Sequence, residues 1–556
     1  MSGSGTSTIR VGVLCNSLVL QRWQADAIQQ LRSVAGVQIV VVVLNDTTAV
    51  TRAPLGQFLY RQYRKLFFKP SAMDTIDLSA ELASIPKLHC RPVIEKRREH
   101  FSAADLRSMD EFKPDVLLRF GFNILGGKIL GLPKYGVWSF HHGDPERFRG
   151  GPPGLWEIMK GSKITGAVLQ RLTEELDAGH ILKQGWFHTI DHGLSETVDT
   201  VLSRSAIWPA QVMQQLLAGD ASAAIGTVPE KRGELYRYPD NFQFLRFIWK
   251  QFRNKVRFHR QELNVHEEWN IGVLYQPITM LLEEQGSLNI RWLPPPSPNN
   301  FRADPFGYTG SDGSLNVLYE KYDHQEGKGG IHRVRPRRDS VLKRSREMLT
   351  SPGHLSYPYV VQYNGSVYVV PESHDQGVVD LHRVKEDNEG LEKICRLLDL
   401  PLIDPTLFQH EGHWWLFGSM APLSNTTLYA YYSEQLEGPY TPHLLNPLKF
   451  DVRSARPAGT PFYKDGILYR PAQDSSETYG GRIAITRIIE LTPVSFKEEL
   501  VKYVGPFSGM YDKGTHTIAA VGDVTLVDGK RFITVAQRKA QVKKRKIERL
   551  KRLIEA

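Results

Sequence analysis

The C-terminal half of the chain repeats one short pattern, a turn glycine followed by a β-rich run of residues. A strand precedes each turn, and in four of the five cases it begins near a proline. The spacings between successive glycines are 52, 47, 54 and 63 residues, the five being Gly313, Gly365, Gly412, Gly466 and Gly529. A hairpin that recurs about every 50 residues is typical of propeller blades, small sheets that bury their faces against one another. We therefore predict an all-β, five-bladed propeller over residues 299–540, with a two-sheet β-sandwich as the alternative.

The N-terminal part alternates between strand and helix patterns. A strand at 9–14 is followed by a segment with apolar residues at helical spacing at 21–31 and by a β-branched strand at 37–44. Another buried strand is expected at 112–120, after a helix that Ser102 can cap. This order predicts an α/β doubly wound, Rossmann-type domain over residues 1–220. In such open sheets, ligands bind at the carboxyl ends of the strands.

Composition excludes several classes of protein. Hydrophobic residues make up 41% of the 556 residues and charged residues 23%, which excludes a largely disordered chain. The three cysteines form no CxxC pair, and the longest apolar run, 37–44, is too short to span a bilayer. The N-terminus lacks the pattern of a signal peptide. We therefore expect a reducing, cytoplasmic location.

The formal net charge of +10 is concentrated in three basic segments, at 59–69, 244–260 and 537–552. Residues 221–298 are predicted to be a basic, aromatic linker, and 541–556 a basic C-terminal helix. The basic segments fit peripheral contact with an anionic membrane, or solvated faces whose aromatic residues pack against a domain. We expect no DNA partner, and the sequence does not predict the oligomeric state.

Chemically reactive residues gather in the loop-like segment 136–156, which contains two histidines, an aspartate and two arginines among glycines and prolines. It carries the motifs Ser-Phe-His at 139–141 and Arg-Gly at 149–150, and Leu-Asp-Ala-Gly follows at 176–179. This pattern resembles the formyltransferase family, which includes methionyl-tRNA formyltransferases and sugar N-formyltransferases, over about residues 8–215. The resemblance implies formyl transfer from 10-formyl-tetrahydrofolate to an amine, with His141 and Asp177 as catalytic residues. Ser139 stands where the family has asparagine.

Elementary chemistry supports these roles. Amine attack on a formyl carbon needs a base near neutral pH and a donor for the developing oxyanion. His141 with Asp177 fits the base, and Ser139 offers a donor on a shorter arm than an amide, so His142 or backbone N–H groups are alternative donors. We assign His142, together with Asp144 and Arg149, to substrate binding. Metal ligation by His141, His142 and Asp144 is the less favoured interpretation, and we predict no metal.

Acidic residues recur at matching positions of the predicted blades and are expected to face a common axial pocket suited to sugars. The five predicted sugar-binding acids are Asp304, Glu320, Glu372, Asp404 and Asp474. The Asp-Pro strand openings and X-Gly hairpins resemble five-bladed family 43 glycoside hydrolases. The segments FRADPF, PESH and RPAQD look still more like the N-terminal domain of plant glucosamine inositolphosphorylceramide transferases, and this resemblance covers about residues 268–540. The resemblance implies carbohydrate recognition. For hydrolysis, Asp304 and Glu372 are the candidate pair.

These features together predict an enzyme, a one-carbon or acyl group transferase. It would formylate an amino sugar or a glycan precursor that the propeller holds in part, with 10-formyl-tetrahydrofolate as the donor. Three alternatives stay open at this point. They are a non-catalytic carbohydrate-binding or scaffold protein, a glycosidase that acts through the propeller, and transfer of another acyl group.

Overall fold

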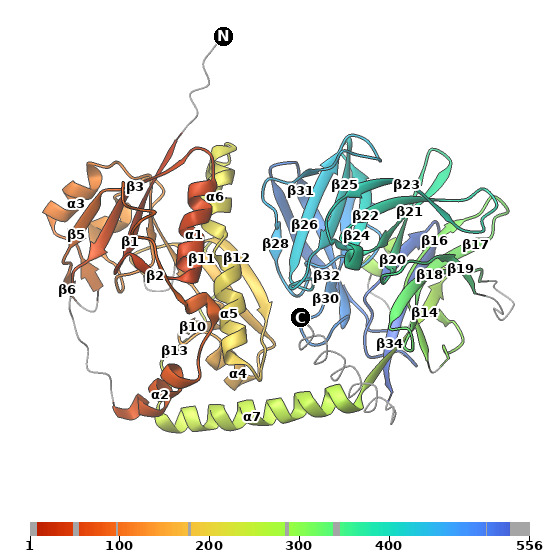
Figure 1. Cartoon of the computed structure of the whole chain (residues 1–556), viewed down its shortest axis with the longest axis horizontal. Helices are drawn as coiled ribbons and strands as arrows, with labels where there is room; N and C mark the ends of the chain where they lie inside the picture. Colours follow the sequence, from red (N-terminus) through yellow and green to blue (C-terminus); the bar gives the residue numbers. More distant parts are fainter. Residues whose placement is uncertain are drawn as a thin grey trace, which may run out of the picture. The chain divides into compact units, whose positions relative to one another are not determined.

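A computed structural model of the chain describes residues 8–47, 55–95, 98–175, 179–283, 288–297, 299–336, 345–507 and 509–533 (Figure 1). The chain divides into two compact units, Met1–Val256 and Arg257–Ala556, which are called unit 1 and unit 2. None of the helices within the described ranges is long and apolar enough to cross a membrane. The predicted C-terminal helix at 541–556 lies outside the described residues.

Unit 1 is built on a sheet that has seven strands in the described residues, in the order β12-β11-β9-β8-β1-β3-β5. The first five strands along the chain pair in parallel, and the last two pair antiparallel at one edge. The bounds are β1 Ile9–Cys15, β3 Val37–Asn45, β5 Lys87–Cys90, β8 Val116–Arg119, β9 Val137–His141, β11 Ile164–Arg171 and β12 His180–His188. The predicted doubly wound, formyltransferase-like architecture is confirmed.

Helices cover both faces of this sheet (Figure 1). On one face, Met109 of α3 joins a core with Leu117 and Val137. On the other face, Ile28 of α1 packs on Val42. Ser102 caps α3 as predicted, since its side chain accepts a hydrogen bond from the Asp105 amide. The helices are α1 Arg22–Ser33, α2 Phe58–Leu66, α3 Ala103–Asp110, α4 Leu155–Lys160, α5 Leu194–Ser205, α6 Trp208–Leu217 and α7 Asn241–Asn264; the short strands are β2 Val19–Gln21, β4 Thr75–Asp77, β6 Val93–Glu95, β7 Arg98–His100, β10 Phe148–Gly150 and β13 Glu234–Tyr236.

Unit 2 is a propeller of five antiparallel sheets in the described residues, as predicted. Blade 1 combines strands from both ends of the unit, in the order β15-β14-β34-β33, and blades 2 to 5 follow in chain order. The strands are β14 His266–Leu274 and β15 Arg291–Trp292; β16 Asn300–Thr309, β17 Leu315–Asp323, β18 Lys328–Val334 and β19 Arg346–Leu349; β20 Ser356–Tyr363, β21 Ser366–Glu372, β22 Val379–Val384 and β23 Leu391–Leu398; β24 Ile403–His410, β25 His413–Ser419, β26 Thr427–Ser433, β27 Thr441–Pro442 and β28 Lys449–Phe450; β29 Phe462–Lys464, β30 Ile467–Asp474, β31 Arg482–Leu491 and β32 Phe496–Val504; β33 Ile518–Val521 and β34 Val524–Ile533.

The segment 221–298, predicted to be a linker, is instead divided between the two units. Strand β13 pairs with β10 of unit 1. The helix α7 continues that unit, since Phe244 and Phe247 join its core. Strand β14 then pairs along its whole length with β34 and so closes the propeller ring. The prediction failed here because the partner of β14 lies about 260 residues later, a pairing that local sequence patterns do not reveal.

The predicted turns are present in four of the five hairpins. Both residues of three turns have positive φ, the values being 47° and 76° at Asn364 and Gly365, and the same holds at residues 411–412 and 465–466. Such turns match the twist of the flanking strands. The fifth prediction is wrong, because Gly529 lies inside β34 and pairs with Asn270. The turn is at Gly522, which has a φ of 56°.

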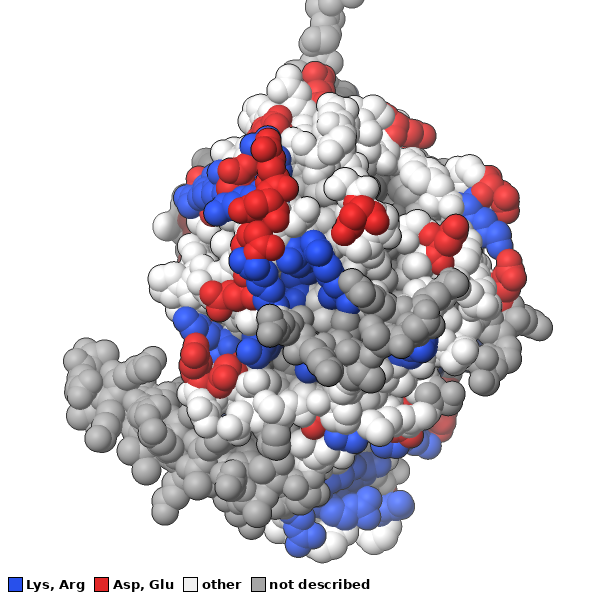
Figure 2. Space-filling view, turned by 90° about the vertical axis from the view of Figure 1, so that its right-hand side faces the viewer, with Lys and Arg blue, Asp and Glu red and all other residues white. Residues whose placement is uncertain are grey.

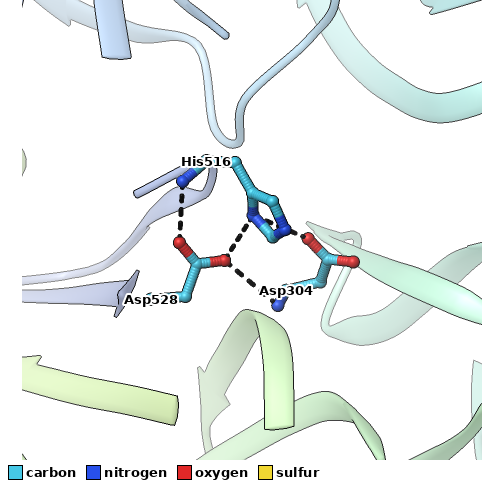
Figure 3. Close-up of side chains that lie close together, drawn as sticks. All are labelled: Asp304, His516 and Asp528. Atoms are coloured by element: carbon cyan, nitrogen blue, oxygen red, sulfur yellow. Dashed lines mark hydrogen bonds and ion pairs between the residues drawn. The ribbon is translucent and has the colours of Figure 1, made fainter. Parts of the chain in front are cut away.

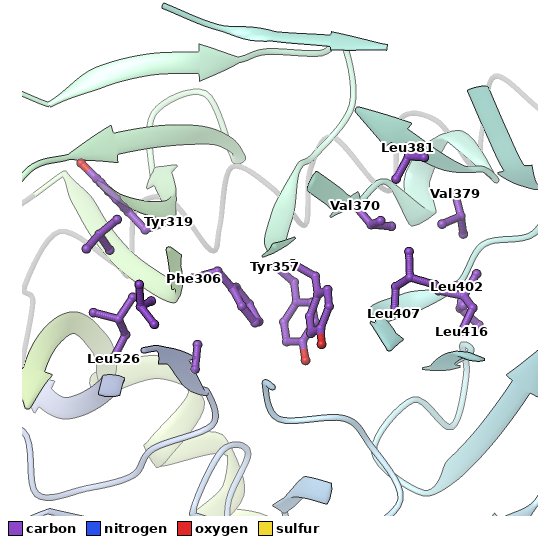
Figure 4. Close-up of a cluster of buried hydrophobic side chains, with 14 of the residues drawn as sticks. Phe306, Tyr319, Tyr357, Val370, Val379, Leu381, Leu402, Leu407, Leu416 and Leu526 are labelled. Atoms are coloured by element: carbon purple, nitrogen blue, oxygen red, sulfur yellow. The ribbon is translucent and has the colours of Figure 1, made fainter. Parts of the chain in front are cut away.

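Apolar side chains from neighbouring blades form a shared core, shown in Figure 4. Phe306 of blade 2 lies beside Tyr357 of blade 3, with ring centroids 4.7 Å apart. Leu526 of blade 1 and Leu407 of blade 4 belong to the same buried cluster. Each sheet therefore buries its faces against the next one, which is why the repeat is stable only as a ring.

Candidate functional site

The predicted catalytic segment of unit 1 lies at the carboxyl ends of two parallel strands. Arg119 ends β8, and His141 ends the neighbouring strand β9. Side chains alternate along a strand, so Ser139 and His141 share one face of the sheet, and Phe140 and His142 share the other. This edge is where open parallel sheets bind ligands.

The Ser139 side chain is buried and accepts a hydrogen bond from an arginine. The Nε of Arg119 donates to the Ser139 Oγ at 3.1 Å. Another guanidinium nitrogen of Arg119 donates to the carbonyls of Phe122 and Asn123, which fixes the orientation of the group. Because the Ser139 hydroxyl accepts from Arg119, its own proton is left for the Phe140 carbonyl, 3.4 Å away, or for a ligand.

His141 is half-buried, and one of its ring nitrogens is fixed by the backbone. Its Nε2 lies 3.3 Å from the carbonyl oxygen of Phe148. Since a carbonyl only accepts hydrogen bonds, this contact places a ring proton on Nε2 and fixes the orientation of the ring. A neutral imidazole can accept a proton from an attacking amine.

Ser139 and His141 line one pocket of about 110 Å³. The pocket also contains Arg119 and Gln170, which sequence analysis did not single out. Gln170 sits beside Ser139 because β9 and β11 pair in that register, a contact that a single sequence does not show. A second hollow of about 370 Å³ shares the segment 173–175 with this pocket. The site therefore has polar groups in the smaller pocket, and the adjoining hollow offers room for a ligand that is larger than this pocket.

Other predicted residues of this loop are placed elsewhere. The His142 ring packs edge-on against Trp23, with centroids 5.0 Å apart, and its Nε2 lies 3.3 Å from the Ser205 hydroxyl. Burial lowers the pKa of His142 to about 3, with a smaller contribution from His141, so it is neutral at physiological pH. Asp144 accepts from the Glu146 amide within its own loop. Substrate contacts by His142, Asp144 and Arg149 stay predictions.

Asp177, the second predicted catalytic residue, lies outside the described residues, in the stretch 176–178. Glu175 and Gly179, which flank this stretch, both line the pocket. Its catalytic role stays a prediction.

In unit 2, the inner strands of three blades share one residue with the same unusual backbone. Asp304, Tyr357 and Asp404 each have a positive φ, between 40° and 52°, and each precedes a proline. The strand register shifts at the same points. Such β-bulges redirect a side chain. A non-glycine residue in this region carries strain, so the surrounding structure must compensate for it.

Carboxylates around the propeller axis hold adjacent blades together. The amide of Tyr357 donates to Asp304 across blades 2 and 3, at 3.3 Å. The amide of Asp404 donates to Glu372 across blades 3 and 4, at 2.9 Å. Arg456 then pairs with Asp404, its Nε donating at 2.5 Å. These acids are 7% exposed or less, so they are ties between blades as well as candidate ligands.

Asp304 also belongs to a buried triad with His516 and Asp528, shown in Figure 3. The His516 Nδ1 lies 2.5 Å from Asp528 and 3.5 Å from Asp304. Burial lowers the pKa of His516, but the two carboxylates outweigh it and the pKa is raised. The arrangement fits an imidazolium between two carboxylates, and the three ligand atoms, all within 4.8 Å of one another, also have the spacing of a metal site.

Two positions of the ring differ from the prediction. Asp474 bonds to Arg482 and to the Ser476 amide, and the preceding residue, Gln473, donates to Asp404 at 2.8 Å. Gln473 therefore takes the position predicted for Asp474, because successive strand residues face opposite ways. Asp528 was missed because it was assigned to a turn.

The pKa values of Glu320 and Glu372 are shifted in opposite directions in this ring. Burial, followed by the charges of Asp304 and the other ring acids, raises the pKa of Glu320 well above its usual value. Burial acts in the same direction on Glu372, but a hydrogen bond from His374 and the charge of Arg456 lower its pKa to about 2. A carboxyl group with a raised pKa and one with a lowered pKa thus lie in one cluster.

Comparison with known families agrees with the two-part organisation. Residues 66–215 match the family model described as formyl transferase. Residues 294–515 match the model of the N-terminal region of glucosamine inositolphosphorylceramide transferase 1. The first unit is therefore similar to formyltransferases, and the second to one region of a glycolipid-related transferase.

Individual relatives cover only parts of the chain. Glucosamine inositolphosphorylceramide transferase 1 of Arabidopsis thaliana is 35% identical over 215 residues, which are 37% of this chain and 28% of that protein. Methionyl-tRNA formyltransferase of Treponema pallidum subsp. pallidum is 31% identical over 195 residues, 35% of this chain and 56% of that protein. Glycinamide ribonucleotide transformylase 1 from Symbiobacterium toebii is a solved structure with 16% identity and a TM-score of 0.28, covering 38% of this chain and 89% of that one. The chain thus spans less than two thirds of the curated relatives.

Proposed function

We propose that the chain transfers a formyl group from 10-formyl-tetrahydrofolate to the amino group of an amino sugar or glycan precursor, which the propeller helps to hold. The observation that carries this proposal is the pocket at the ends of β8 and β9, where His141, Ser139 and Arg119 converge. The match of residues 66–215 to formyl transferases supports it.

The pocket residues fit the reaction step by step. The amine nitrogen attacks the formyl carbon, a new C–N bond forms, and the formyl oxygen becomes an oxyanion. Arg119 and the Ser139 hydroxyl supply hydrogen-bond donors for that charge. The guanidinium group thus compensates for the serine side chain, which is shorter than the asparagine of the formyltransferase family. His141 accepts the amine proton. The bond between the formyl carbon and N10 of the folate then breaks, and N10 takes up the proton.

The acceptor is inferred from the propeller. Its match to part of a glucosamine inositolphosphorylceramide transferase favours a sugar or glycan ligand, and formyl transfer requires an amine. An amino sugar satisfies both requirements.

Donor binding is expected to stabilise unit 1 in the full-length chain. Saturation with a stable donor analogue, such as 10-formyl-5,8-dideazafolate, adds about 2.7 kcal/mol at 100 times its Kd. For a unit of this size, that raises the melting temperature by about 5–10 °C. Differential scanning calorimetry measures the shift of the unit 1 transition.

A matched pair of variants controls this experiment. Ile124 lines the pocket, and Ile94 is an exposed residue of the same unit outside the pocket. Ile124→Trp should fill the pocket and abolish the shift, whereas Ile94→Trp should keep it. A folded chain that shows no shift contradicts a folate donor and favours another acyl donor or a non-catalytic binding role.

Glycoside hydrolysis by the propeller is a second candidate, favoured by the raised pKa of Glu320 and the lowered pKa of Glu372 in one cluster. Hydrolysis needs one protonated and one ionised carboxyl group. The full-length chain is then expected to release sugar from an oligosaccharide panel, and Glu320→Gln to abolish the release. Absence of any release, or equal release by Glu320→Gln, counts against it.

A further inference from the structure

The helix α7 has two apolar faces, of which unit 1 buries only one. Phe244 and Phe247, 4% and 0% exposed, pack into the core of the unit. Three other aromatic side chains are largely exposed: Phe242 at 69%, Trp249 at 65% and Phe252 at 58%. Exposed aromatic residues on this scale indicate a contact surface, since single scattered apolar side chains need no such explanation.

The exposed side chains form a stripe along the helix. At about 100° per residue, Phe242, Leu245, Trp249 and Phe252 fall within an arc of about 80°. Trp249 and Phe252 are in ring contact, with centroids 6.1 Å apart. Arg246 and Arg253 fall directly beside the stripe, on the side away from the core. The exposed part of α7 therefore carries an apolar stripe with a basic border.

The helix α2 extends this surface. It packs against the first turns of α7, where the Leu59 amide donates to Asn241 and the Tyr60 ring contacts Phe244. Its own end exposes Leu66 at 56% and Phe67 at 71%. Both helices lie along the lower edge of unit 1 in Figure 1. We call the exposed side chains of these two segments the α2–α7 face; they are Phe58, Leu66, Phe67, Phe242, Leu245, Arg246, Trp249, Phe252 and Arg253.

The charge on these segments has one sign. Residues 55–69 contain four Lys and Arg residues, residues 241–261 contain six, and neither segment contains an acidic residue. Figure 2 shows Lys and Arg side chains gathered at its lower edge. Apolar side chains bordered by uncompensated basic ones are the composition of helices that lie in a membrane interface.

We propose that the α2–α7 face binds the surface of an anionic phospholipid membrane. Trp249, Phe252 and Phe242 would enter the boundary between headgroups and acyl chains, and Arg246 and Arg253 would contact lipid phosphates. The aliphatic Leu245 and Leu66 favour lipid over RNA, since they add apolar contact with acyl chains but no stacking surface for bases. The pocket of unit 1 would then work beside a membrane, where a lipid-linked amino sugar is accessible.

Vesicle binding by the full-length chain tests this proposal. At about 0.15 M salt, the chain is expected to sediment with phosphatidylcholine vesicles that contain about 30% phosphatidylserine, and at least tenfold more weakly with pure phosphatidylcholine. Trp249→Ser with Phe252→Ser is expected to lower the partition coefficient at least tenfold. Arg246→Glu with Arg253→Glu is expected to remove the preference for anionic vesicles.

A matched control comes from the same unit. Val93 and Ile94 are exposed apolar residues of the strand β6, outside the α2–α7 face, so Val93→Ser with Ile94→Ser should bind like the unchanged chain. Circular dichroism verifies that each variant is folded. The proposal would be overturned if the unchanged chain did not bind anionic vesicles, or if binding were undiminished after Trp249 and Phe252 are replaced. Salt-dependent RNA binding without vesicle binding would also overturn it.

Discussion

Replacing His141 by alanine is expected to slow formyl transfer by a factor of about 10² to 10⁴, because the attacking amine loses its proton acceptor. The His141 Nε2 is hydrogen-bonded to the Phe148 carbonyl, which orients the imidazole ring before substrate arrives. The measurement is tetrahydrofolate formation from 10-formyl-tetrahydrofolate with a panel of amino sugars. The loss should fall on kcat more than on KM, since a proton acceptor acts mainly in the transition state.

His89 is the matched control for this variant. It is an exposed histidine of unit 1 that pairs with Asp46 and does not line the pocket. His89→Ala should keep full activity. Calorimetry should give the His141→Ala chain a melting temperature close to that of the unchanged chain, because the side chain is only half-buried. Activity of His141→Ala within threefold of the unchanged chain would contradict a catalytic role.

Local signals account for the part of the fold that the sequence predicted. Turn pairs such as Asn364-Gly365 select the hairpin because they adopt positive φ easily. The same reasoning failed near the C-terminus, where two glycines were available. Only Gly522 makes the turn, whereas a side chain at Gly529 would place its Cβ 2.5 Å from the Trp292 ring. That steric reason comes from a distant strand and has no local signature.

In the candidate site too, local sequence patterns predict some positions, and others depend on distant strands. Strand alternation is enough to place Ser139 and His141 on one face of β9 and His142 on the other. Gln170 and Arg119 reach the pocket through the register of neighbouring strands, which a single sequence does not specify. In the propeller, an error of one residue moved the ring position from Gln473 to Asp474. The prediction of site residues was therefore limited more by unknown strand pairing than by the choice of reactive residue types.

Replacing Glu498 by glutamine is expected to lower the free energy of unfolding of unit 2 by about 3–5 kcal/mol, because it leaves the buried Arg470 and the partly buried Lys449 without their anion. Glu498 accepts from Arg470 at 2.6 and 2.8 Å and from Lys449 at 2.7 Å. Burial raises the pKa of Glu498, but these two cations outweigh it and lower the pKa to about 2. Urea denaturation, monitored by hydrogen exchange of the backbone amides in β30 and β32, measures this loss of stability.

The depressed pKa also predicts a pH dependence. An acid whose pKa is lower in the folded chain contributes stability above its unfolded pKa, near 4.5, and loses it as the pH falls toward 2. The unchanged chain should therefore lose about 3 kcal/mol across this window from this group, and Glu498→Gln should lose none of it. The neighbour Glu499 is half exposed and pairs with Arg487, so Glu499→Gln should change stability by less than about 1 kcal/mol. Lys449 belongs to blade 4 and Arg470 to blade 5, so Glu498 links the two blades through its ion pairs. If Glu498→Gln and Glu499→Gln lowered the stability equally, this link would not stabilise the propeller.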